Sequence, residues 1–194
     1  DELAKIIHVN ADGDYPGLSA YVVRGLFSIA DGGDSLRDRL NEIKAEVSQA
    51  ISDGAHIIVL SDRDGDAENA PIPSLLLTSA VHHHLIKTGL RTDANILVET
   101  GFARDPHQFA VLLGFGATAV YPYLAYDVIN DLVAKGELLG DPIHAQANFR
   151  KGIEKGLLKV LSKMGISTVA SYRGGQLFEA VGLSSEVVDQ CFLG

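Results

Sequence analysis

The stretch that decides the fold lies between residues 56 and 99 and contains HIIVL at 56–60, SLLLTSAVHHHLIKT at 74–88 and NILVE at 95–99. The first and last runs are short, apolar and rich in β-branched residues, as is typical of buried strands. The middle run stops before Gly89, which predicts a helix ended by a residue that tolerates the left-handed conformation. Strand, helix and strand in this order form one βαβ unit, and such a unit predicts a parallel sheet.

The same alternation continues on both sides of this unit. We expect further strands at 6–9, 25–29, 118–121 and 165–170. We expect further helices at 35–52, 105–113, 126–135, 142–162 and 176–180. The sequence therefore predicts an α/β protein with a mainly parallel sheet of repeated βα units. A flavodoxin-like open sheet and a partial (β/α) barrel both fit this string of elements.

The composition is that of a globular protein and excludes several classes. The 194 residues include 46% hydrophobic residues and carry a net charge of −9, which argues against general disorder and against a nucleic-acid or anionic-membrane surface. The single Cys191 excludes a disulfide framework within the chain and a Cys-rich metal or iron–sulfur site, and it fits a cytoplasmic protein. No targeting signal or membrane-spanning run is visible, and the absent initiator Met and the abrupt end at 192–194 suggest a piece of a longer protein.

Three motifs suggest ligand sites, and each has a simpler interpretation. The acids of 62–66 are spaced like a calcium loop, but Ala67 and Pro73 occupy the positions that need Gly and a bidentate Glu. Residues 114–119 resemble a dinucleotide fingerprint, but they end a helix and lead into a strand, which is the reverse order. The histidines at 82–84 are adjacent on a helix, so they cannot converge on one ion, and we expect one to be buried and two to lie at the boundary.

The residues alone leave two functional hypotheses open. The loops after Leu60, Glu99 and Tyr121 follow strands, where ligands bind in parallel α/β folds, so the chain could be a free-standing module that binds a small ligand. A small enzyme that uses Asp62, Glu99 and His107 is the other hypothesis, although the sequence contains no self-contained catalytic constellation.

Several strings together resemble the central domain of glutamate synthase. They are IVLSDR at 58–63, IPSLL at 72–76, AVHHHLI at 80–86, ETG at 99–101, ARD at 103–105, GFGA at 114–117 and YPYLA at 121–125. KGLLKVLSKMGIST at 155–168 and SYRG at 171–174 look like the opening of the family's FMN-binding domain, a (β/α)8 barrel. The resemblance begins near residue 33, divides the chain into 1–150 (central-domain portion) and 151–194 (start of the FMN barrel), and favours the barrel-like form.

The resemblance implies a role in glutamate biosynthesis and ammonia assimilation. In this oxidoreductase family a large chain joins a glutaminase, the central domain, the FMN barrel and a β-helix, and a small subunit supplies electrons. Glutamine and 2-oxoglutarate become two glutamates with reduced FMN and a [3Fe-4S] cluster, and ammonia passes through an internal tunnel. Tyr121 before Pro122 points to the bacterial NADPH-dependent type, whereas Phe102, Gln108 and Gly175 depart from common forms.

This chain lacks the family's catalytic cysteine and its cluster cysteines. The resemblance therefore implies a connecting segment that helps to wall the tunnel, with no catalytic residue, no metal site and no cofactor of its own. Its partners would be the other domains of the large chain and the small subunit, and an exposed edge of the sheet would favour self-association.

One cofactor-binding stretch is expected in this chain. In (β/α)8 barrels the cofactor lies at the carboxyl ends of strands, so we expect FMN of the full-length protein to contact Lys163, Met164, Gly165, Ile166 and Ser167. Gly165 would allow close approach of the ring, and Lys163 could offset the charge of reduced flavin.

Overall fold

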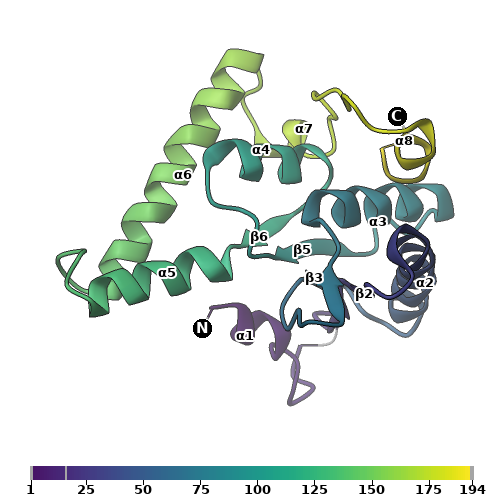
Figure 1. Cartoon of the computed structure of the whole chain (residues 1–194), viewed down its shortest axis with the longest axis horizontal. Coiled ribbons are helices and arrows are strands. Elements are labelled where there is room, and N and C mark those ends of the chain that lie inside the picture. Colours follow the sequence, from purple (N-terminus) through teal and green to yellow (C-terminus); the bar gives the residue numbers. More distant parts are fainter. Residues whose placement is uncertain (1, 16, 193–194) are drawn as a thin grey trace.

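A four-stranded parallel sheet forms the centre of the computed structural model, which describes residues 2–15 and 17–192 (Figure 1). Its strands, in spatial order, are β1 (Ala20–Arg24), β3 (Ile57–Ser61), β5 (Asn95–Glu99) and β6 (Ala119–Tyr121). All three neighbouring pairs are parallel. Two short strands, β2 (Leu26–Ser28) and β4 (Asn69–Pro71), pair antiparallel beside this sheet.

The two faces of the sheet are covered differently. Helices α2 (Gly32–Ser52), α3 (Ser74–Thr88) and α4 (Pro106–Gly114) cover one face, and the short helix α1 (Glu2–Ile7) lies on the other (Figure 1). Because side chains alternate along a strand, Ile58 and Ile96 pack towards the three helices, whereas Val59 and Leu97 pack against Leu3 of α1.

The C-terminal third of the chain is helical. Helices α5 (Tyr123–Ala134) and α6 (Pro142–Met164) form a hairpin at one side of the molecule, and α6 packs across α4 (Figure 1). Two short helices follow, α7 (Val169–Tyr172) and α8 (Ser185–Cys191), and α8 packs on α3. Among the described residues, no helix has the length and apolar character needed to cross a membrane.

The structure confirms the α/β class, the mainly parallel sheet and most of the expected elements. The helix at 74–88 and the strand at 95–99 have the expected bounds, and Gly89 caps α3 in the left-handed conformation. Asp105 and Asp141 accept hydrogen bonds from the first backbone N–H groups of α4 and α6, so both helices begin at the expected residues.

Three expected elements are wrong, and two strands lie outside the expected ranges. Residues 6–9 lie at the end of α1 rather than in a strand, and residues 176–180 form no helix. The expected strand at 165–170 is absent because Gly165 (φ 71°) caps α6 and Thr168 accepts a hydrogen bond from Ser171 N to begin α7. The additional strands are β1, which precedes the expected strand at 25–29, and β4, which lies where a loop was expected and pairs with β2.

Candidate functional site

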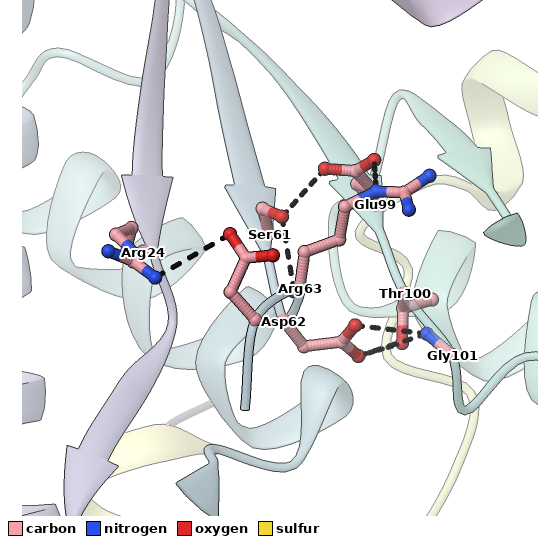
Figure 2. A network of polar contacts seen from close by, with 8 residues as sticks. Arg24, Ser61, Asp62, Arg63, Glu99, Thr100 and Gly101 are labelled. Atoms are coloured by element: carbon pink, nitrogen blue, oxygen red, sulfur yellow. Dashed lines mark hydrogen bonds and ion pairs between the residues drawn. The ribbon is translucent and has the colours of Figure 1, made fainter. Parts of the chain in front are cut away.

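One row of side chains crosses the carboxyl end of the sheet. Arg24, Ser61, Glu99 and Tyr121 end β1, β3, β5 and β6 and are paired in register. Ser61 and Glu99 lie two residues beyond Val59 and Leu97, and Tyr121 itself packs against that cluster, so the row belongs to the face of the sheet that carries α1. The loops after Leu60, Glu99 and Tyr121 therefore do meet at one edge, as expected, and Figure 2 shows the polar contacts that join most of this edge.

Glu99 is the centre of the first group of contacts. Its side chain is buried, with 6% of the residue exposed, and its Oε2 accepts a hydrogen bond of 2.6 Å from Ser61 Oγ (Figure 2). Its Oε1 accepts from Arg63 Nε, and the Arg63 guanidinium lies 4.0 Å from the centroid of the Tyr123 ring. Burial alone would lower the pKa of Arg63, but the hydrogen bond and the charge of Glu99 outweigh it and raise the pKa.

Asp62 is the centre of the second group. Its Oδ2 accepts a 2.5 Å hydrogen bond from Thr100 Oγ1, and the Gly101 N–H donates to both carboxylate oxygens at 3.0 and 3.1 Å (Figure 2). Burial and the nearby Asp62 charge raise the pKa of Tyr123 to about 12, so this phenol stays protonated at neutral pH. A Cβ atom at residue 101 would lie 3.2 Å from the Tyr123 hydroxyl, which is a tight contact.

The two carboxylates of the network are already hydrogen-bonded within the chain. Both oxygens of Glu99 and both oxygens of Asp62 accept hydrogen bonds from groups of this chain. These contacts fix the positions of the two carboxylates and of the loops that carry them. The edge is thus a polar surface held by contacts within the chain, where the pair between Arg24 and Asp64, 3.5 Å apart, and part of the Arg63 side chain are exposed to solvent.

The residues of the enzyme hypothesis do not form one group. His107 lies in the first turn of α4, where its ring packs against Phe178 with the ring centroids 5.8 Å apart. Asp62 and Glu99 instead belong to the two separate hydrogen-bonded groups of the edge. His107, the third residue of this hypothesis, therefore lies on another element and contacts Phe178.

The acidic loop after β3 is a turn held by its own side chains. Asp66 Oδ1 accepts hydrogen bonds from Glu68 N at 2.8 Å and from Asn69 N at 2.7 Å. These backbone hydrogen bonds hold the pKa of Asp66 below its usual value. The pattern is that of an Asx turn leading into β4.

The three adjacent histidines each have a different partner. The expectation of one buried ring is wrong, because His82 and His83 are both buried and His84 is half-buried. Arg91 Nε donates to His82 Nδ1 at 2.8 Å, His83 Nδ1 lies 2.8 Å from Ser79 O, and His84 Nε2 lies 2.7 Å from Ser48 Oγ. Nothing in the sequence pattern pointed to Arg91, since it comes from the loop after α3.

The lone cysteine is buried as expected. Cys191 ends α8, and burial raises the pKa of its thiol to about 11. The thiol is therefore protonated and unreactive at neutral pH.

The expected FMN-contacting stretch lies at the end of α6. Lys163 and Met164 are its last residues, Gly165 is its cap, and Ser167 is exposed. The N–H groups of Gly165 and Ile166 donate to carbonyl groups of the last helical turn, at distances of 3.2 and 3.0 Å. The Lys163 and Ser167 side chains are exposed, but the stretch does not follow a strand, so the FMN contact stays a prediction.

Comparison with known proteins identifies relatives for nearly the whole chain. The family model of the glutamate synthase central domain matches residues 1–184. The ferredoxin-dependent glutamate synthase of Pyropia yezoensis is 46% identical over 189 residues, and the large chain of the NADPH glutamate synthase of Bacillus subtilis is 44% identical over 180 residues. The alignments include 91% and 93% of this chain but 12% of each relative, so the chain spans about an eighth of their length.

Solved structures support the barrel-like fold. A mandelate oxidase covers 88% of this chain with a TM-score of 0.54 and 17% identity, and 42% of its own length is matched. A flavocytochrome b2 covers 98% with a TM-score of 0.54 and 13% identity, and 43% of its length is matched. These neighbours establish the fold, whereas the family follows from the sequence matches. The chain belongs to the glutamate synthase central-domain family.

Proposed function

We propose that the chain is a connecting segment of a glutamate synthase large chain, placed between the glutaminase and the FMN-binding parts. The observation that carries this proposal is the coverage: 93% of this chain aligns with only 12% of the Bacillus subtilis large chain. The parent would be an oxidoreductase that forms two glutamates from glutamine, 2-oxoglutarate and a reductant. The [3Fe-4S] cluster and most of the FMN contacts would lie in other parts of it.

The finer role is to supply part of the wall of the ammonia tunnel without chemistry of its own. The carboxyl edge of the sheet supports this role, because the carboxylates of Asp62 and Glu99 are buried and hydrogen-bonded within the chain. A wall for ammonia needs a fixed surface that does not protonate or trap the passing molecule. Asp62, Glu99 and Tyr123 in their observed contacts provide such a surface.

The experiment compares two glutamates in the full-length protein. Glu99→Gln removes the buried charge that binds Arg63, and Glu186→Gln removes the exposed carboxylate that lies 2.7 Å from Arg37. We expect Glu99→Gln to lower glutamine-dependent glutamate formation and to release free ammonia, while glutaminase turnover and flavin content stay normal. Glu186→Gln should behave like the unmodified protein. Complete coupling in Glu99→Gln would contradict the tunnel role.

The rival hypothesis of a free-standing ligand-binding module is tested separately. Calorimetry of the 194-residue chain against FMN, nucleotides and 2-oxoglutarate should give no micromolar binding. A native reading frame several times longer than 194 codons is also expected. Micromolar affinity, or a native product of about this size, would favour the free-standing module.

We also propose that the protein is cytoplasmic and that the boundary between its central domain and its FMN-binding domain lies near residue 150.

We further propose that residues 163–167 contact FMN in the full-length protein. The test is Gly165→Val, because a larger side chain there would crowd the ring. Gly182→Val is the matched control, since Gly165 (φ 71°) and Gly182 (φ 79°) share a left-handed backbone, and nothing lies within 4 Å of the point that a Cβ atom would occupy at either residue. Loss of flavin in Gly165→Val alone supports the contact, and full flavin content in both variants refutes it.

A further inference from the structure

A polar depression lies at the amino end of the sheet, opposite the network of the carboxyl edge. Its volume is about 360 Å³, and it is lined by His82, Arg91, Thr92, Ala94, Asn95 and Arg173. These residues come from α3, from the loop before β5, from the start of β5 and from the residue after α7. Segments far apart in the sequence therefore bring two arginines and a histidine together.

Arg91 is held in a fixed position at this depression. Its Nε donates to His82 Nδ1 at 2.8 Å, and its two terminal nitrogens donate to the carbonyl groups of Ala94 at 2.8 Å and Gly116 at 2.9 Å. Three of its five N–H groups are used, so two stay available in a guanidinium that is already oriented.

The contact with Arg91 defines the state of His82. A guanidinium can only donate, so His82 Nδ1 must accept and the proton of the neutral ring must lie on Nε2. Burial, followed by the charge of Arg91, lowers the pKa of His82 to about 4, in agreement with a neutral ring. Only 7% of His82 is exposed, and its Nε2–H has no hydrogen-bond partner among the described residues.

The remaining groups are also donors. Asn95 Oδ1 accepts from Thr118 Oγ1 at 3.4 Å, which leaves the amide N–H groups of Asn95 without a partner in residues 2–15 and 17–192. Arg173 is exposed, and no described carboxylate lies within 4.0 Å of its guanidinium or of that of Arg91. Burial lowers the pKa of Arg91, and the positive charge of Arg173 lowers it further.

We propose that this depression is a binding site for a small oxyanion, with Arg91, Arg173 and His82 Nε2–H as the donors to a phosphate or carboxylate group. Two arginines without a described carboxylate partner line the same depression, although the chain as a whole carries a net charge of −9. An oxyanion between them relieves their repulsion and uses the free N–H groups in charge-assisted hydrogen bonds. The site is independent of the role proposed above for the carboxyl edge.

The test is a titration of the 194-residue chain with inorganic phosphate at constant ionic strength, followed by NMR of the Arg Nε–H and backbone amide signals. We expect saturable shifts at Arg91, Arg173 and Asn95, with a dissociation constant on the order of 1 mM. A second titration with acetate distinguishes a carboxylate ligand from a phosphate ligand, and chloride serves as the non-oxyanion control.

Two arginine variants make the test specific. Arg173→Ala should weaken binding by about tenfold, because it removes one charged donor without a described side-chain contact. Arg104→Ala is the matched control, since Arg104 is also exposed and its side chain has no described ion pair, and it should change the affinity less than twofold. Equal shifts with chloride, no saturation with either oxyanion, or equal weakening in both variants would overturn the site.

Discussion

Gly116 is a residue at which backbone conformation and packing both exclude a side chain. Its φ is +110°, and a Cβ atom there would lie 2.3 Å from His82 Nδ1. Gly116→Ala should therefore strain the backbone and push His82 away from Arg91, which we expect to cost about 3 kcal/mol in the free energy of unfolding. Urea denaturation measures this difference.

Gly54 provides the control for Gly116. Its φ is +100°, but nothing lies within 4 Å of a Cβ atom at this position. Gly54→Ala should cost only the backbone strain, about 1 kcal/mol. An equal loss in the two variants would mean that the contact with His82 contributes nothing.

His82 also predicts a pH dependence of stability. Its pKa is about 4 in the folded chain, against about 6.5 in the unfolded chain, so the unfolded state binds more protons between these values. Stability from this group is present above about pH 6.5 and is lost as the pH falls towards 4. The free energy of unfolding should fall by about 2 kcal/mol between about pH 7 and pH 5.

His82→Asn isolates this contribution. The variant should lose most of the difference between the neutral and the acidic condition, whereas His144→Asn, at an exposed position of α6, should keep it. Denaturation curves at the two pH values provide the comparison. A full pH dependence in His82→Asn would place its origin elsewhere.

At the scale of elements, two glycines of α6 lie in opposite environments. A Cβ atom at Gly156 would lie 2.5 Å from the Pro106 ring, so the glycine allows α6 to approach the start of α4. Gly152, one turn earlier, has nothing within 4 Å. Gly156→Ala should destabilise the chain by about 2 kcal/mol, whereas Gly152→Ala should stabilise it by up to about 1 kcal/mol. Thermal melting of both variants tests the helix contact, and the same sign in both would contradict it.

The elements that were predictable have strong local signals. The strand at 95–99 and the helix at 74–88 combine an uninterrupted apolar pattern with clear stop residues. The run at 165–170 also has β-branched residues. Its secondary structure depends on whether Gly165 ends the preceding helix and Thr168 begins the next one. Short apolar runs of this kind do not distinguish a strand from a cap, because the period is too short to read.

The candidate site was predictable only as a location. Polar residues directly after three strands indicated that their loops would meet at one edge, and they do. Which atoms pair could not be predicted, because the contact of Asp62 with Thr100 depends on the register of β3 and β5. The depression at Arg91 and Arg173 gave no local signal, since its two arginines are 82 positions apart in the sequence.

At the scale of the molecule, amide protection from hydrogen exchange should differ between the central sheet and the C-terminal part of the chain. The amides of β3 and β5 lie inside the sheet, with a paired strand on each side. Residues 165–184 contain only the four-residue α7 and are mostly exposed. We expect amides in 165–184 to exchange much faster than those in 57–61 and 95–99. Equal protection of these regions would show that the C-terminal part is held by contacts of another kind, such as pairing with a second chain.

The parallel register has a consequence for the order in which the chain can fold. The pairs Ala20 with Ile57, Ile57 with Asn95 and Leu97 with Ala119 join residues 37, 38 and 22 positions apart. Each pairing closes a long loop, which slows the formation of a parallel sheet. On a ribosome that adds about 5–20 residues per second, the apolar strand at 57–61 waits roughly 2–8 s for β5 to be synthesised. During that interval the edge of IIVLS that later pairs with β5 has no partner strand.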